Sequence, residues 1–127
     1  MSDIPHILLV DDDRQVVRYL KKALEEAGYA VTATTSGKQA LASLHAPLPD
    51  LLILDLNMPV PDGFELLRTV RAQFPYLRIL AISGYLQGAL LEAAELLGAI
   101  ATLEKPVAAE KLVAKVRAVI GESRGGK

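Results

Sequence analysis

Short apolar runs alternate with amphipathic stretches along the whole chain. The runs of strand length lie at 6–10, 29–35, 50–55, 77–83 and 99–104. Each run is followed by residues whose apolar positions recur at helical spacing, as Val16, Leu20, Leu24 and Ala27 do after the first run. In the third run the apolar residues do not alternate with polar ones, which indicates a strand buried on both faces. The pattern therefore predicts five strands that alternate with five helices.

Helix boundaries and helix faces are also marked in the sequence. Gly28 is expected to end the first helix, and Ser36 is expected to cap the second. The later helices have apolar faces that include Leu67, Val70 and Phe74, a leucine-rich stretch at roughly 86–97, and Leu112, Val116, Val119 and Ile120.

Strict alternation of strands and helices with short connections predicts right-handed crossovers and an open parallel sheet. With five strands, we expect a flavodoxin-like doubly wound (βα)5 sandwich whose strand order is 2-1-3-4-5. In that order the topological switch point lies between the first and third strands. Ligands are then expected beyond the carboxyl ends of these two strands.

Acidic residues follow both strands at the switch point. Asp11 and Asp12 come after the first strand, and Asp55 ends the third. Three carboxylates that converge need a cation, and a partly hydrated Mg²⁺ matches oxygen ligands of this kind. The loop after Asp55 could also turn the backbone carbonyl of Asn57 toward the metal, although the loop alone is better explained as a tight strand-to-helix turn.

Two further polar elements are predicted at the same edge of the sheet. The fourth strand ends in Ser83-Gly84, and the fifth ends in Lys105-Pro106. A lysine there would bring a cation toward the carboxylates and toward any bound phosphate. Each feature is ordinary by itself, but features at four successive strand ends together indicate a site.

Composition limits the classes of function. The chain has 127 residues, enough for one domain, which we expect to span 1–121 with a flexible tail at 122–127. Its 14 basic and 15 acidic side chains give a net charge of −1, so no contact with nucleic acid or a membrane is expected. It has no cysteine, no secretory signal pattern and no apolar run of membrane-spanning length, and we expect a cytoplasmic protein.

The segments "LLVDDD", "LLILDLNMPVPDGFELL", "AISGY" and "LEKPV" resemble, in this order and spacing, the receiver domain of bacterial two-component response regulators. The resemblance covers essentially the whole chain. It implies that Asp55 is the phosphoacceptor, that Asp11 and Asp12 hold Mg²⁺ together with Asp55, and that the Asn57 carbonyl is a further ligand. It also implies that Ser83 and Lys105 contact the phosphoryl group, that Asp13 only caps a helix, and that the Lys105-Pro106 peptide is cis.

The resemblance further implies how such a domain works. A sensor histidine kinase or a histidine phosphotransfer protein would donate the phosphoryl group to Asp55. The domain would catalyse its own phosphorylation and slow dephosphorylation, and would not be an enzyme that turns over a separate substrate. A downstream protein effector would bind the face formed by the helix at 86–97, the strand at 99–104 and the last helix. A homodimer is also compatible with the resemblance.

Several positions depart from the family pattern. Thr102 stands where an aromatic residue usually acts in switching, Val107 follows the Lys-Pro pair where many receivers have an aromatic residue, and the bulky Tyr85 lies near the mouth of the site. In the helix at 86–97, the face that should pack on the sheet includes Leu86, Leu90, Ala93, Ala94 and Leu97. Leu91 and Leu96 flank this face, and an exposed leucine there would be a partner contact.

The alternative function is a Mg²⁺-dependent phosphatase or phosphotransferase of the haloacid dehalogenase type. Its nucleophile would be an aspartate after the first strand, and Asp11 with Asp13 has the required spacing. The chain is short for such an enzyme and offers no cap domain. A flavodoxin-like flavin or nucleotide binder would instead need a Gly-rich or Ser/Thr-rich phosphate loop where this chain has acids.

Overall fold

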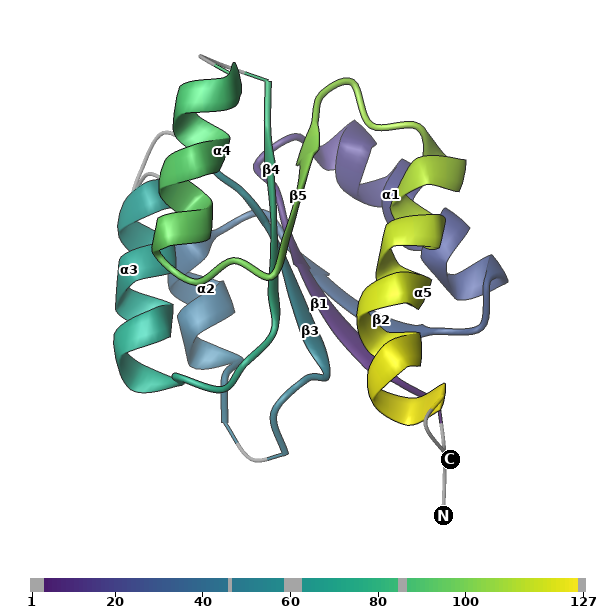
Figure 1. The fold of residues 1–127 in the computed structure, drawn as a ribbon. Coiled ribbons are helices and arrows are strands. Elements are labelled where there is room, and N and C mark those ends of the chain that lie inside the picture. The colour runs from purple at the N-terminus through teal and green to yellow at the C-terminus, as the bar shows by residue number, and fades with distance from the viewer. Residues whose placement is uncertain (1–3, 46, 59–62, 85–86, 126–127) are drawn as a thin grey trace.

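The five strands form one parallel sheet in the order β2-β1-β3-β4-β5 (Figure 1). The computed structural model describes residues 4–45, 47–58, 63–84 and 87–125. The strands are β1 (His6–Val10), β2 (Ala30–Thr34), β3 (Leu51–Asp55), β4 (Ile79–Ser83) and β5 (Ala101–Glu104). The predicted flavodoxin-like order is confirmed, and β1 and β3 lie side by side at the switch point.

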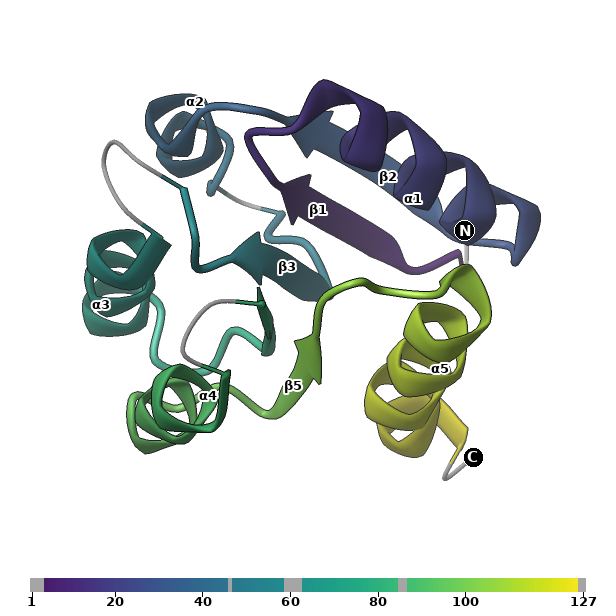
Figure 2. The same cartoon turned by 90° about the horizontal axis from the view of Figure 1, so that it is seen from above.

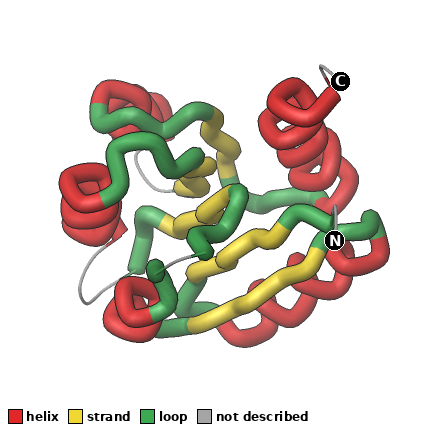
Figure 3. Tube along the Cα trace, turned by 90° about the horizontal axis from the view of Figure 1, so that it is seen from below, coloured by secondary structure: helices red, strands yellow, loops and turns green. Residues whose placement is uncertain are grey.

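Helices cover both faces of the sheet. They are α1 (Arg14–Glu26), α2 (Gly37–Ala42), α3 (Gly63–Gln73), α4 (Gln87–Leu96) and α5 (Ala109–Gly125). Figure 2 shows α1 and α5 on one face and α2, α3 and α4 on the other. The sheet is thus the middle layer of a three-layer sandwich, as Figure 3 also shows from below.

The central strands are apolar on both faces because both faces are covered. In β3, Leu52 and Leu54 belong to the core under α2, α3 and α4, whereas Leu51 and Ile53 belong to the core under α1 and α5. All four side chains are fully buried. This confirms the interpretation of the run at 50–55, since a parallel strand between two helical layers has no solvent side.

Local capping places the start of α1 and α2 where the sequence predicts it. The Asp13 carboxylate accepts hydrogen bonds from the backbone N–H groups of Gln15 and Val16, so Asp13 is the N-cap of α1. Ser36 Oγ accepts from the N–H of Gln39 in the same way. Gly28, at φ 106°, adopts the left-handed conformation that follows the end of α1.

Several boundaries differ from the prediction, since β2, β3, β4 and β5 are each one or two residues shorter than the predicted runs. β4 begins at Ile79 and not at residue 77, because the N–H of Leu77 bonds to the carbonyl of Phe74 in the preceding turn. α5 continues to Gly125, past residue 121, where the sequence was expected to give way to a flexible tail. No proline interrupts the backbone there, and a single glycine at 121 lowers helix propensity without ending a helix.

The predicted packing face of α4 is found where it can be observed. Ala94 is buried and Leu97 packs against the core, while Glu92 and Glu95 are exposed. Leu96 is 87 % exposed. Tyr85, Leu86 and the side chains of Leu90 and Leu91 lie outside the described residues, as do Pro59, Pro61 and Asp62 of the loop after β3.

Candidate functional site

The carboxyl ends of β1 and β3 bring the three predicted acids together. Asp11, Asp12 and Asp55 each offer a carboxylate oxygen, and these oxygens all lie within 4.8 Å of one another. Asp11 and Asp55 are buried, whereas Asp12 is exposed. An acidic cluster that is closed on one side and open on the other is compatible with a partly hydrated metal ion.

Asp11 is held in a position that disfavours its charge. The N–H of Asp13 donates to Asp11 Oδ1 at 2.9 Å. Burial nevertheless raises the pKa of the Asp11 carboxyl to about 6, and the nearby charge of Asp55 adds to the rise, while the Asp13 hydrogen bond and the Lys105 ammonium oppose it. The pair Asp11 and Asp55 is therefore electrostatically strained without a cation.

Asp55 is bound on both of its oxygens. Its Oδ2 lies 3.0 Å from the Nζ of Lys105, and its Oδ1 accepts the backbone N–H of Asn57 at 2.9 Å. The side chain of Asp55 is 1 % exposed, while that of Lys105 is 33 % exposed. The lysine thus crosses from the end of β5 to the end of β3 and fixes the carboxylate from its solvent side.

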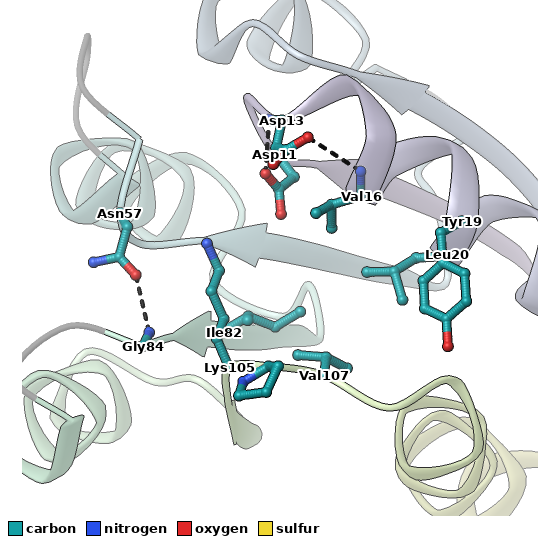
Figure 4. Close-up of a pocket in the computed structure, with 11 residues that line it drawn as sticks. Asp11, Asp13, Val16, Tyr19, Leu20, Asn57, Ile82, Gly84, Lys105 and Val107 are labelled. Atoms are coloured by element: carbon teal, nitrogen blue, oxygen red, sulfur yellow. Dashed lines mark hydrogen bonds between the residues drawn. The ribbon is translucent and has the colours of Figure 1, made fainter.

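The Asn57 side chain also joins the site, which sequence reasoning did not predict. Its Oδ1 accepts the N–H of Gly84 at 3.0 Å (Figure 4). The same oxygen lies 3.4 Å from the hydroxyl of Ser83. The sequence suggested a ligand role only for its backbone carbonyl. No sequence signal points to the amide, because its direction depends on how the loop after β3 meets the end of β4.

Ser83 and Gly84 lie at the end of β4, next to Lys105. The backbone N–H of Lys105 donates to the Ser83 carbonyl at 3.1 Å. A Cβ placed on Gly84 would lie 2.8 Å from the Cβ of Lys105, so a side chain at 84 would displace the lysine. The group that approaches Gly84 closely is therefore the side chain of Lys105. The Lys105-Pro106 peptide bond is cis, as the resemblance implied.

A cavity of about 860 Å³ opens from these residues. Asp11, Asn57 and Lys105 line its polar end, and Figure 4 shows Leu20 and Val107 farther along it, with Tyr19 at the far side. The Tyr19 hydroxyl accepts the N–H of Ala109, which links α1 to the start of α5. The acidic cluster is therefore reached through an opening between the β1–α1 and β5–α5 segments.

The family model of the response regulator receiver domain matches residues 7–117. The chain belongs to this family. Receiver domains of response regulators are signalling domains, and the match includes all the strands except His6 at the start of β1, together with the acidic, serine and lysine positions described above.

Relatives and solved structures agree with this assignment. The chain is 35 % identical over 117 residues to the C4-dicarboxylate transport transcriptional regulatory protein DctD of Rhizobium meliloti, a match that covers 92 % of this chain and 25 % of DctD. It is 36 % identical over 118 residues to the response regulator MprA of Mycobacterium avium, covering 93 % of this chain and 52 % of MprA.

Among solved structures, a CheY-like receiver domain protein from Methanospirillum hungatei superposes with a TM-score of 0.88 at 26 % identity, covering 98 % of this chain and 100 % of that one. A response regulator from Chloroflexus aurantiacus gives 0.85 at 33 % identity, covering 94 % of this chain and 99 % of that one.

This receiver spans about half or less of the length of these two curated relatives. Within the described ranges, none of the helices combines the length and apolar character that a membrane span requires.

Proposed function

We propose that this receiver accepts a phosphoryl group on Asp55 in a Mg²⁺-dependent reaction. The observation that carries the proposal is the Asp55 carboxylate itself. It is buried at the switch point, fixed by Lys105 and by the N–H of Asn57, and adjacent to two further carboxylates. Such a carboxylate is a positioned nucleophile. The lysine beside it can bind negative phosphoryl oxygens, and the neighbouring carboxylates can bind a cation.

The donor set fits Mg²⁺. Asp11, Asp12 and Asp55 would hold the ion through carboxylate oxygens, and the backbone carbonyl of Asn57 is the further ligand that we assign to it. When bound, Mg²⁺ supplies positive charge to the transferring phosphoryl oxygens and neutralises the acidic cluster. Asp11 then becomes fully ionised, because a cation offsets the burial and the repulsion that raise its pKa.

The reaction follows from the residues around Asp55. One oxygen of Asp55 attacks the phosphorus of a phosphohistidine, and the P–N bond breaks with its electron pair leaving on the imidazole nitrogen. The product is an acyl phosphate on Asp55. Phosphoryl transfer of this type depends mainly on positioning and on charge stabilisation, so the chain needs no separate acid or base.

Lys105 and Ser83 would bind the transferred group. The Lys105 ammonium already lies at Asp55 Oδ2 and would shift from the carboxylate to a phosphoryl oxygen once the acyl phosphate forms. The Ser83 hydroxyl lies near Asn57 Oδ1 and can turn to donate to a second phosphoryl oxygen. Both movements begin from hydrogen bonds that lie at the ends of β4 and β5.

The donor would be a sensor histidine kinase or a histidine phosphotransfer protein, and we place the reaction in the cytoplasm. The domain would act as a signalling element that catalyses its own phosphorylation and slow dephosphorylation. A protein effector, or a second copy of the chain, would bind the face of α4, β5 and α5. This part of the proposal is supported by two exposed apolar residues there, Leu96 at 87 % and Ile100 at 53 %.

Phosphorylation by a small donor tests the proposal. Incubation with acetyl phosphate and Mg²⁺ should add the mass of one phosphoryl group to the intact protein, and chelation of Mg²⁺ should prevent the gain. Asp55→Asn should show no gain. Asp13→Asn is the matched control, because it removes a neighbouring carboxylate yet keeps a good N-cap, and it should be labelled like the unmodified protein. An equal gain in Asp55→Asn would overturn the proposal.

A further inference from the structure

β2 is an edge strand with an unprotected ladder. Within the described residues it ends the sheet and pairs only with β1. The Ala30 N–H donates to the Pro5 carbonyl and the Thr34 carbonyl accepts the N–H of Asp11, so residues 30, 32 and 34 face β1. By the alternation of a parallel ladder, the N–H and C=O groups of Val31 and Ala33 face outward. The strand, AVTAT, has none of the charged or proline residues that usually block such an edge.

Hollows flank this edge on both faces of the sheet. The hollow on the α1 side, about 470 Å³, is lined by Arg14, Arg18, Lys21 and Thr35. The hollow on the α2 side, about 600 Å³, is lined by uncharged polar and small residues that include Thr32 and Ser43, and by two histidines. Both hollows share Ala33, Thr34 and Gln39. A strand added to the edge would therefore direct alternate side chains into one hollow and then the other.

The hollow on the α1 side is cationic. Arg14, Arg18 and Lys21 lie at i, i+4 and i+7 of α1, which places them on one helix face. Its lining contains no acidic residue. In the part of the chain that the structure describes, Arg14 and Arg18 form no ion pair, and the pair of Lys21 with Glu25 is solvent-exposed and so readily exchanged. This row favours acidic side chains on whatever lies along the edge.

The same row argues against a second copy of this chain as the occupant. Two β2 edges paired about a twofold axis normal to the sheet would bring both α1 helices to the same face, with their cationic rows opposed. Like charges at that distance disfavour the pairing. An acidic segment of a different protein has no such penalty.

We infer that the β2 edge is a docking site for an extended acidic segment of a partner protein. The segment would add as a sixth strand and bond to the outward groups of Val31 and Ala33. Its acidic side chains would lie in the hollow beside Arg14, Arg18 and Lys21, and its alternate, small or uncharged side chains would lie in the hollow beside α2. This site is separate from Asp55 and does not depend on phosphorylation.

A defined peptide tests the inference on the full chain. The probe is a blocked seven-residue peptide that alternates glutamate with threonine, titrated into ¹⁵N-labelled protein. Saturable shifts should cluster at residues 30–35 and on α1. Amide exchange of Val31 and Ala33 should slow in the complex, which marks strand addition, since charge attraction alone leaves these amides open to water.

Three controls separate the contributions. A peptide of the same charge with N-methyl groups at alternate positions should lose binding, because it cannot complete the ladder. Arg18→Glu should weaken binding by about tenfold or more, equivalent to about 1.4 kcal/mol. Arg117→Glu, an equal charge reversal at an exposed site on α5, should leave binding unchanged.

Several results would overturn the inference. These are no binding at millimolar peptide, equal binding of the N-methylated peptide, equal weakening by Arg18→Glu and Arg117→Glu, or binding without slowed exchange at Val31 and Ala33. The N-methylated peptide arm uses the unmodified protein, so the test does not depend on a variant that folds.

Discussion

Asp11 carries much of the electrostatic cost of the site, and this cost is measurable as a dependence of stability on pH. Its pKa is about 6 in the folded protein and 3.8 for an unperturbed group. Between these values the folded state binds more protons than the unfolded state, so its free energy of unfolding falls as pH rises from about 4 to about 6. Above that window the cost is constant.

Asp11→Asn should remove this dependence. In metal-free buffer the variant should exceed the unmodified protein in free energy of unfolding by up to about 3 kcal/mol at pH 7, and the difference should shrink toward pH 4. Urea unfolding at a series of pH values measures it. Added Mg²⁺ should stabilise the unmodified protein and not the variant. A difference that does not vary between pH 4 and 7 would contradict the assignment of this cost to Asp11.

Gly84 is the residue that admits the lysine. Gly84→Ala should slow phosphorylation by acetyl phosphate by about tenfold or more, because small displacements of a positioned group are costly in catalysis. The displaced group is Lys105, because the Cβ of an alanine at position 84 would lie 2.8 Å from the Cβ of Lys105. Gly121→Ala, where an added Cβ contacts nothing within 4 Å, is the control and should react at the normal rate. Equal rates for all three proteins would refute this role.

At the residue scale, prediction from sequence succeeds where topology alone determines position. Asp11 and Asp55 meet because each ends a strand at the switch point, which the alternation of strands and helices already requires. The amide of Asn57 was not predicted, since its contact with Gly84 depends on loop conformation. The raised pKa of Asp11 likewise depends on burial, which becomes known only when the helices are packed on the sheet.

At the element scale, the acids at the start of α1 divide into structural and functional groups. Asp13→Ala should lower the free energy of unfolding by about 1 kcal/mol, because it removes the N-cap that accepts from Gln15 and Val16. It should leave the rate of phosphorylation unchanged. Asp12→Ala should show the opposite pattern. It should abolish the stabilisation by Mg²⁺, but it removes no N-cap and so should not lower the free energy of unfolding through lost capping. Thermal unfolding with and without Mg²⁺ distinguishes them, and loss of the Mg²⁺ response in Asp13→Ala would contradict the division.

Strand interiors were predicted more securely than strand ends. In β3 apolar residues do not alternate with polar ones, and this pattern indicates burial on both faces wherever the strand begins or ends. The start of β4 was misplaced because Leu77 is apolar and buried like a strand residue, yet its N–H is used by a turn. Apolar character reports burial, whereas strand membership depends on which backbone group is the hydrogen-bond partner.

α4 is the element through which we expect the phosphorylated state to be sensed. Thr102 on β5 has no aromatic ring to rotate, so a change at Asp55 would pass through Ser83 and Gly84 into α4. Beryllofluoride, a mimic of the phosphoryl group, should alter amide hydrogen exchange across residues 83–97. Changes confined to β5 and α5 would contradict this route, and Asp55→Asn should show none.

At the scale of the whole molecule, the fold separates two surfaces. The acidic site lies at the carboxyl ends of the central strands, whereas the β2 edge, with its cationic row on α1, lies at the border of the sheet. The order of strands, predicted from the sequence, explains both, because it places β1 and β3 at the centre and leaves β2 with a free edge. The hollows beside that edge were not predicted, since they depend on how α1 and α2 pack.

Asp55 is the residue that we propose receives the phosphoryl group, whereas the alternative enzyme class would use an aspartate after β1. Locating the label by tandem mass spectrometry decides between them. After reaction with acetyl phosphate and Mg²⁺, the acyl phosphate is trapped chemically and the protein is cleaved after lysine and arginine. The fragment 1–14 contains Asp3, Asp11, Asp12 and Asp13, whereas the fragment 39–68 contains Asp50, Asp55 and Asp62. The modification should lie in fragment 39–68, on Asp55, and modification of Asp11 in fragment 1–14 would rule out Asp55 as the phosphoacceptor.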